Sequence, residues 1–144
     1  MTALDQIRKV SEQFYAGLTR MASGERDAFA DVWAHSATVT TMHPTGGQQV
    51  GWEAVEESFN QVSEMASDGK VVLTDQRIEV AGDMAYELGI ENGQFNLGGH
   101  PLSFEHRVTN IYRREDGGWK MVHHHADTSP AMQDVLRRLE APSA

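Results

Sequence analysis

Strand-forming runs separated by short polar turns fill the second half of the chain. Two turns, Ala81–Asp83 and Glu115–Gly118, are rich in Asp and Gly, which let a chain reverse direction within a few residues. Each turn lies between two runs that contain β-branched and aromatic residues, and this pattern predicts two antiparallel hairpins. The four runs are Lys70–Val80, Met84–Glu91, Pro101–Arg114 and Trp119–Ala126.

Helix signals dominate the first half. Apolar residues recur at helical spacing over the first about 20 residues, and the pair Ser23-Gly24 ends this predicted helix. The next predicted elements are a short helix around Phe29–Trp33, a strand over Ala37–His43, a turn over Pro44–Gly47 and a helix over Trp52–Ala66. A last helix is predicted to begin at Ser129-Pro130, an N-cap followed by the proline that favours a first helical turn.

This order of elements predicts an α+β fold. Helices that precede a long meander of strands pack on one face of an antiparallel sheet, and long strands that curl around them leave a cavity. The chain has 144 residues, the length of one domain, so we expect a single domain over residues 1–144. Only Ala141–Ala144 are expected to fray.

Composition excludes several classes of function. The formal net charge of −9 opposes binding to nucleic acid and to an anionic membrane surface. The sequence has no apolar run near 18 residues and no export signal, so we expect a cytoplasmic protein. With no cysteine it has no thiolate nucleophile or thiolate metal ligand, and we expect no cofactor.

One segment carries a family resemblance. From Arg107 to Ala126 the sequence reads RVTNIYRREDGGWKMVHHHA, which resembles SnoaL-like proteins of the nuclear transport factor 2 (NTF2)-like superfamily and the association domain of calcium/calmodulin-dependent kinase II. Met42–Pro44 followed by Gly51–Val55 resembles the same group. The resemblance implies a cone-shaped fold, with N-terminal helices packed on a strongly curved antiparallel sheet that encloses a pocket. Because the superfamily includes isomerases, dehydratases, cyclases and proteins without catalysis, it does not imply one activity.

Three consecutive histidines, His123, His124 and His125, are the most distinctive chemical feature. Side chains alternate along a strand, so His124 and Ala126 share one face while His123 and His125 share the other with Trp119 and Met121. The resemblance implies that His124 and Ala126 line the pocket. His124 is then a candidate general acid or base, the alternative being a core histidine satisfied by one neighbour.

The outward pair, His123 and His125, raises the possibility of a metal site. Two histidines two positions apart on a strand can chelate a metal, but they need a third ligand such as His106 or Asp127. A polar interface is the simpler interpretation, and we expect no metal.

Further candidates come from the other elements. His43, held extended before Pro44, is a second candidate acid or base near His124, although it could equally cap a loop. Candidate ligand-binding residues, each of which could also be structural, are Trp33, Trp52, Phe59, Tyr86, Arg107 and Thr109. Arg107 would hold an anion inside a pocket, or would pair with Glu105, Glu87 or Glu91 at the sheet edge.

Two functions remain open. The first is a pocket protein for a small apolar or aromatic molecule, which it could isomerise, dehydrate or cyclise by histidine acid–base chemistry. The second is a non-catalytic oligomerisation module that resembles the kinase association domain. That domain has pocket arginines where this chain has Leu88, Thr109 and Ala126, which favours an apolar ligand here. A homodimer through the broad sheet face is expected in both cases.

Overall fold

A strongly curved, open six-stranded sheet with the order β2-β1-β6-β5-β4-β3 organises the computed structural model, which describes residues 1–140. Neighbouring strands are antiparallel except β1 and β6, which run parallel. Residues 141–144, where fraying was expected, lie outside the described residues. The strands are β1 (Thr40–His43), β2 (Gly46–Val50), β3 (Ala66–Ala81), β4 (Met84–Leu97), β5 (His100–Glu115) and β6 (Gly118–Ala126).

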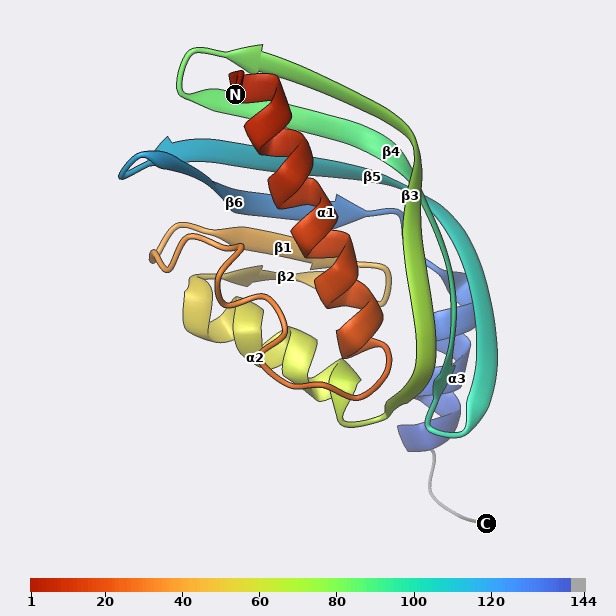
Figure 1. Cartoon of the computed structure of the whole chain (residues 1–144). Helices are drawn as coiled ribbons and strands as arrows, with labels where there is room; N and C mark the ends of the chain where they lie inside the picture. Colours follow the sequence, from red (N-terminus) through yellow and green to blue (C-terminus); the bar gives the residue numbers. More distant parts are fainter. Residues whose placement is uncertain (141–144) are drawn as a thin grey trace.

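The longest helix, α1 (Ala3–Met21), lies across the concave face of the sheet (Figure 1). Thr2 and Asp5 form a reciprocal capping box at its start, which satisfies backbone amides that have no partner within the helix. Its apolar face is buried in the core through Ile7, Phe14 and Leu18. Helix α2 (Trp52–Ser63) adds Val55 and Phe59 to the same core, so the predicted α+β class is confirmed.

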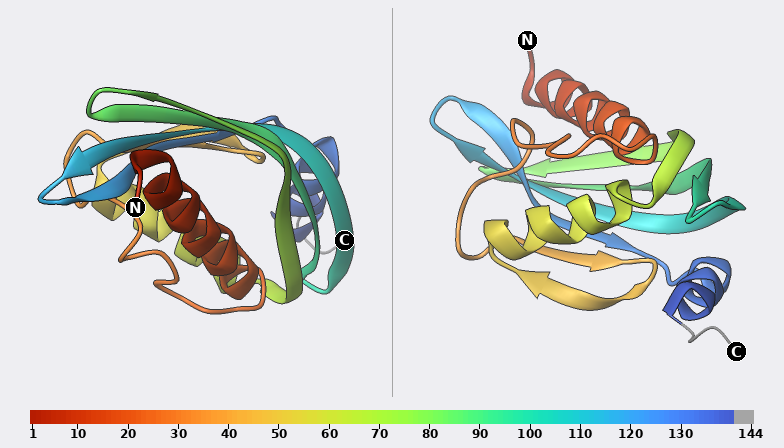
Figure 2. Two further views of the ribbon diagram at one scale, coloured as in Figure 1. Left: turned by 45° about the horizontal axis from the view of Figure 1, so that its top comes forward. Right: turned by 90° about the horizontal axis from the view of Figure 1, so that it is seen from below.

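Helix α3 (Pro130–Glu140) packs at the strongly curved end of the sheet (Figure 2). As predicted, Ser129 precedes Pro130 as the cap, and its hydroxyl accepts a hydrogen bond from the Met132 amide at 3.3 Å. The Ser129 amide donates to the Pro44 carbonyl oxygen at 2.7 Å, which ties the start of α3 to the β1–β2 turn. Because Leu139 lies against Gly98, the helix reaches from that turn to the β4–β5 turn.

The structure corrects several predicted boundaries. Residues 29–32 form turns rather than a helix, and Trp33 forms a β-bridge to Met121. The Met121 amide donates to the Val32 carbonyl oxygen and the Ala34 amide donates to that of Met121, which ties this segment to β6. The predicted turn after His43 contains the start of β2, which pairs with β1 as a tight hairpin. Helix α2 ends at Ser63, and β3 begins at Ala66.

The two hairpins predicted in the second half are confirmed, with longer strands than expected. Strand β4 extends to Leu97, and β4 also pairs with β5 along its whole length. None of the helices within residues 1–140 is both long and apolar enough to span a membrane.

Candidate functional site

A partly open cavity of about 70 Å³ lies between the concave side of the sheet and all three helices. Its apolar lining is Leu18, Met21, Ala22, Pro44, Phe59, Val62, Val71, Phe95, Leu97, Phe104, Met132 and Leu136. Its polar lining consists of His43, Thr45, Glu91, His106 and His124. Among the described residues that line the cavity there is no Lys or Arg, so the one charged side chain there is a carboxyl group.

A β-bulge decides which histidine of β6 faces inward. Ile111 pairs with His123 while the next residue, Tyr112, pairs with Met121, so Val122 is an extra residue in the ladder. His124 is therefore buried on the same side as Met121, and His123 and His125 point outward. The expected inward position of His124 is confirmed, but the strict alternation that grouped Met121 with His123 is wrong because the bulge shifts the pattern.

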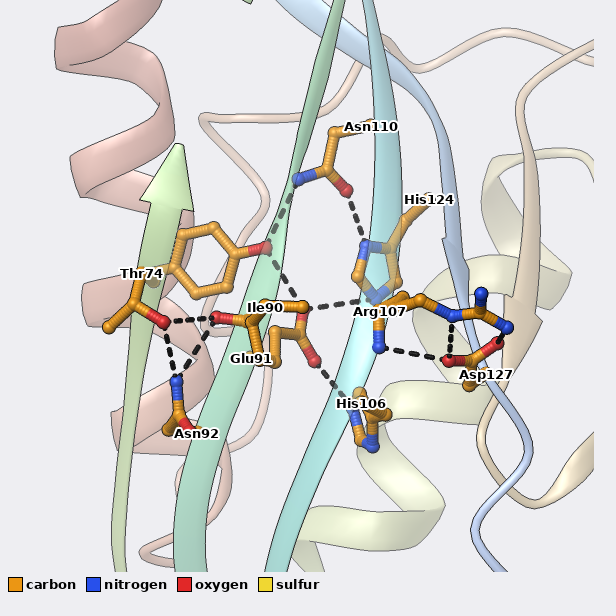
Figure 3. Close-up of polar contacts among 10 residues, drawn as sticks. Thr74, Ile90, Glu91, Asn92, His106, Arg107, Asn110, His124 and Asp127 are labelled. Carbon is orange, nitrogen blue, oxygen red and sulfur yellow. Dashed lines mark hydrogen bonds and ion pairs between the residues drawn. The ribbon is translucent and has the colours of Figure 1, made fainter. Parts of the chain in front are cut away.

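Glu91 is the centre of the polar part of the cavity (Figure 3). Its carboxyl group accepts hydrogen bonds from the Tyr15 hydroxyl at 3.0 Å and from His106 Nε2 at 2.8 Å. His124 Nε2 lies 3.6 Å from the second carboxyl oxygen. Burial raises the pKa of Glu91, but the positive charge of His124 and the bonds from His106 and Tyr15 outweigh it and hold this pKa below its ordinary value.

Asn110 fixes the orientation of His124. The Asn110 amide nitrogen donates to the Tyr15 hydroxyl at 3.1 Å and to Glu87 at 2.9 Å, so its oxygen is left to accept. His124 Nδ1 lies 2.6 Å from that oxygen and must donate to it. The remaining nitrogen, Nε2, faces Glu91. Burial lowers the pKa of His124, although the negative charge of Glu91 opposes this effect.

A second buried carboxyl group, Glu87, lies outside the cavity lining and holds the Asn110 side chain that orients His124. It accepts hydrogen bonds from Ser11 at 2.6 Å, Gln76 at 2.7 Å and Tyr112 at 2.7 Å, besides the bond from Asn110. Burial raises the pKa of Tyr112 well above its ordinary value, so this phenol stays a donor. Glu87 therefore holds Asn110, and through it His124, without lining the cavity.

His43 lies across the cavity from Glu91 as a neutral imidazole. Its Nε2 is 2.7 Å from the Ser58 hydroxyl, and that hydroxyl already donates to the Val55 carbonyl oxygen, so His43 must be the donor. The ring packs edge-on against Phe59 with centroids 4.8 Å apart. Burial, and the positive charge that His124 can carry, lower the pKa of His43 to about 4.

The structure brings together three of the predicted site residues, His124, His43 and Phe59, around the cavity. Trp33 is 1% exposed in the core and does not line it, because its ring packs among Phe14, Trp52 and Phe59. Trp52 stacks on His35 outside the cavity, with centroids 4.6 Å apart. The other three candidates, Tyr86, Arg107 and Thr109, lie on the outer face of the sheet, away from the cavity.

Arg107 does not bind an anion inside the fold. Its side chain is 81% exposed and forms a two-point ion pair with Asp127, at 2.8 Å and 3.2 Å (Figure 3). The predicted partners Glu87 and Glu91 are buried on the opposite face. Leu88 and Thr109 lie on the outer face, and Ala126 is buried without lining the cavity, so none of the three positions compared with the arginines of the association domain lines this cavity.

The outward histidines do not meet the third ligand that a metal site would need. His123 and His125 lie with ring centroids 6.2 Å apart on the outer face, whereas His106 is buried on the inner one. Asp127 is engaged by Arg107. Within residues 1–140 no group of three or more potential ligand side chains could hold a metal ion.

Comparisons with known proteins agree with this geometry on the fold. The chain is similar to a candidate dehydratase of the NTF2-like family from Streptomyces avermitilis, with 24% identity over 88% of this chain and 96% of that one, and a TM-score of 0.75. A candidate calcium/calmodulin-dependent protein kinase type II association domain from Thiobacillus denitrificans has 26% identity over 85% and 94%, with a TM-score of 0.64. A candidate aromatic ring hydroxylase from Novosphingobium aromaticivorans has 20% identity over 89% and 92%, with a TM-score of 0.75. No curated protein matches the chain.

The family follows from the sequence match. The model of the SnoaL-like domain matches residues 7–132, which include most of α1, all six strands and the start of α3. The cone-shaped arrangement of helices on a curved, open sheet is the one seen in the NTF2-like structures. The chain therefore belongs to the SnoaL-like domain family.

Proposed function

We propose that this protein binds a small, mainly apolar molecule in the cavity and acts on it by general acid–base catalysis. The observation that carries this proposal is the buried Glu91, held between His106, His124 and Tyr15 at one wall of a mainly apolar cavity. Buried carboxyl and imidazole groups in contact are typical of catalytic sites, because burial and neighbouring charge tune their proton affinities.

Proton transfer would centre on the Glu91–His124 pair. A neutral His124 can take a proton at Nε2 from a bound substrate, and the nearby Glu91 carboxylate stabilises the imidazolium that forms. Returning this proton to another carbon gives an isomerisation, and giving it to a leaving hydroxyl gives a dehydration that releases water. A positioned acid or base of this kind contributes about 10²–10⁴-fold in rate.

The comparisons support this class of reaction without identifying a substrate. One similar structure is that of a candidate dehydratase, a class of enzyme that moves protons by acid–base catalysis. The 3% exposure of Glu91 supports an acid–base role, because a carboxyl group this deeply buried has a proton affinity set by its neighbours.

The test is a screen of small hydroxylated and carbonyl compounds in D₂O, followed by NMR for deuterium incorporation or loss of water. We expect Glu91→Gln, which keeps the shape of the side chain, to lower any turnover by at least about 100-fold. Glu105→Gln, an exposed change on the other face of β5, is the matched control. Near-ultraviolet circular dichroism verifies the fold of both variants. Turnover that survives in a folded Glu91→Gln variant would contradict the proposal.

A non-catalytic oligomerisation module is the second candidate. It is favoured by the apolar side chains Met84, Tyr86 and Leu88, which are 39–45% exposed on the outer face of β4, and by the similarity to association domains. If this function holds, Glu91→Gln leaves the assembly and its partners unchanged and no turnover is found for the wild type.

A further inference from the structure

We propose that the cavity selects an apolar ligand that carries a neutral hydrogen-bond donor, namely a hydroxyl group of a phenol or alcohol, and rejects carboxylates. This inference rests on the proposed function and specifies the ligand class of the same site. Its basis is the direction of the hydrogen bonds made by the three histidines, which leave acceptors for a ligand.

His106 provides the clearest acceptor for a ligand hydroxyl group. Its Nε2 donates to the Glu91 carboxylate, so in the neutral ring Nδ1 holds a lone pair. Nδ1 is buried and has no hydrogen-bond partner among residues 1–140. The side chain lines the cavity and is fixed by stacking on Phe104, with centroids 4.7 Å apart. A buried acceptor without a partner costs about 1–3 kcal/mol, which a ligand hydroxyl would recover.

His124 and His43 also donate their N–H groups to protein atoms, as His106 does. His124 donates through Nδ1 to Asn110, and His43 donates through Nε2 to Ser58. Each neutral ring therefore has its single N–H bound to the protein, and its second nitrogen can only accept. Of the polar side chains in the lining, the Thr45 hydroxyl is the one that can also donate while these rings are neutral.

Charge points to a neutral ligand. Glu91 is the only charged side chain among the described residues of the lining, and no Lys or Arg there would balance a ligand carboxylate. Binding of an anion next to Glu91 would be unfavourable, because the anion would lose its hydration and would be repelled by the carboxylate. A hydroxyl group donates to these acceptors without bringing a charge into the apolar cavity.

Ligand size is limited by the volume of the cavity. The cavity of about 70 Å³ is smaller than the roughly 150 Å³ that accommodates benzene in a protein core. A ring-sized ligand therefore requires lining side chains to move aside, and we expect Met132 of α3 to be one of them. Methionine has three rotatable bonds and adapts readily to new shapes, so such a movement is feasible at Met132.

The experiment compares phenol, toluene and benzoate, which share a ring and differ in the attached group. Binding to the full chain is measured at pH 7 by NMR titration and by isothermal calorimetry. We expect phenol to bind at least about tenfold more tightly than toluene, and benzoate more weakly than both. Long-range ¹H–¹⁵N spectra should show Nδ1 of His106 unprotonated, with a shift on phenol binding that toluene does not cause.

A substitution at His106 tests whether this residue causes the preference for phenol over toluene. His106→Phe keeps a flat ring that can stack on Phe104 but removes both ring nitrogens, and it should reduce phenol affinity to that of toluene while toluene binding is unchanged. His125→Phe, on the outer face, should bind all three probes like the wild type.

The other outcomes separate this inference from the proposed function. Equal affinities for phenol and toluene, tighter binding of benzoate, or unchanged phenol selectivity in a folded His106→Phe variant would each overturn the inference and leave the proposed function standing. Failure of all three probes to bind would overturn both.

Discussion

At the scale of single residues, burial controls the proton affinity of the histidines. His43 and His124 both have pKa values below the ordinary one, because an imidazolium in an apolar cavity loses its hydration. The unfolded chain has no such penalty and takes up protons at its ordinary pKa. The two imidazoles are therefore linked to folding as well as to the proposed chemistry.

The first prediction is a loss of stability in mild acid. The pKa of His43 is about 4 in the folded chain, against 6.5 as its ordinary value. Its contribution to stability is complete above pH 6.5 and is lost as the pH falls toward 4, because only the unfolded state gains the proton. The difference is on the order of 3 kcal/mol for this residue.

Urea unfolding at pH 7 and pH 4 of the wild type and of His43→Gln tests this. The glutamine can still donate to Ser58 but does not titrate, so the variant should lose on the order of 3 kcal/mol less between the two pH values. His125→Gln removes an exposed histidine, so its free energy of unfolding should change with pH as that of the wild type does. If the free energy of unfolding of His43→Gln changes with pH as much as that of the wild type, the pKa of His43 is not lowered in the folded chain.

At the scale of elements, the cavity depends on how closely β3 approaches the end of α1. A β-carbon added to Gly69 would lie 2.5 Å from the backbone carbon and oxygen of Ala22, a residue that lines the cavity. The Gly69 amide also donates to the Ser23 hydroxyl at 3.0 Å. Only glycine permits this contact between the two elements.

We therefore expect Gly69→Ala to lower the free energy of unfolding by about 1–3 kcal/mol, since backbone atoms must move apart. Chemical denaturation measures this directly. Gly118→Ala is the control, because a β-carbon there would meet no atom closer than 4.0 Å. Equal stability of the two variants would mean that α1 and β3 separate without cost.

Helix α3 gives a second prediction at this scale. Met132 is 7% exposed and covers the cavity, so Met132→Ala should enlarge it and lower stability, by about 2–5 kcal/mol. The variant should bind toluene more tightly than the wild type, because α3 no longer has to move. Calorimetric titration of both proteins tests this, and unchanged toluene affinity would exclude α3 as the size limit.

At the scale of the whole molecule, we propose a homodimer through the outer face of the sheet. Met84, Tyr86 and Leu88 expose apolar surface there, next to the charged residues Arg77 and Glu79 of β3. An apolar face with a polar border is typical of an interface between subunits. A second copy of the chain would cover these side chains in both subunits at once.

Sedimentation equilibrium at micromolar concentration tests the assembly. The wild type should sediment as a dimer. Leu88→Asp should raise the dissociation constant of the dimer at least about tenfold, because the interface would then bury a charge. Val50→Asp, at a 57% exposed position on β2, should leave the dimer intact. A monomeric wild type would contradict the proposed interface.

The sequence by itself determined the elements that depend on local interactions. The apolar spacing of α1, the Asp-Gly turns of the hairpins and the Ser129-Pro130 start of α3 act over a few residues, and all are confirmed. The resemblance of the last hairpin to SnoaL-like proteins is confirmed as well. The resemblance implied an inward His124, and of the two interpretations of His43 the structure has the one that lines the cavity.

Only the tertiary structure decided which side of β4 is inside. Alternation separates Glu87 and Glu91 from Met84, Tyr86 and Leu88, and hydrophobicity alone would bury the apolar row. The opposite holds, because Tyr15, 76 positions away from Glu91, and Asn110 supply the hydrogen bonds that make buried carboxyl groups tolerable. Such partners come together only when α1, β4 and β5 pack, so no local pattern could reveal the centre of the site.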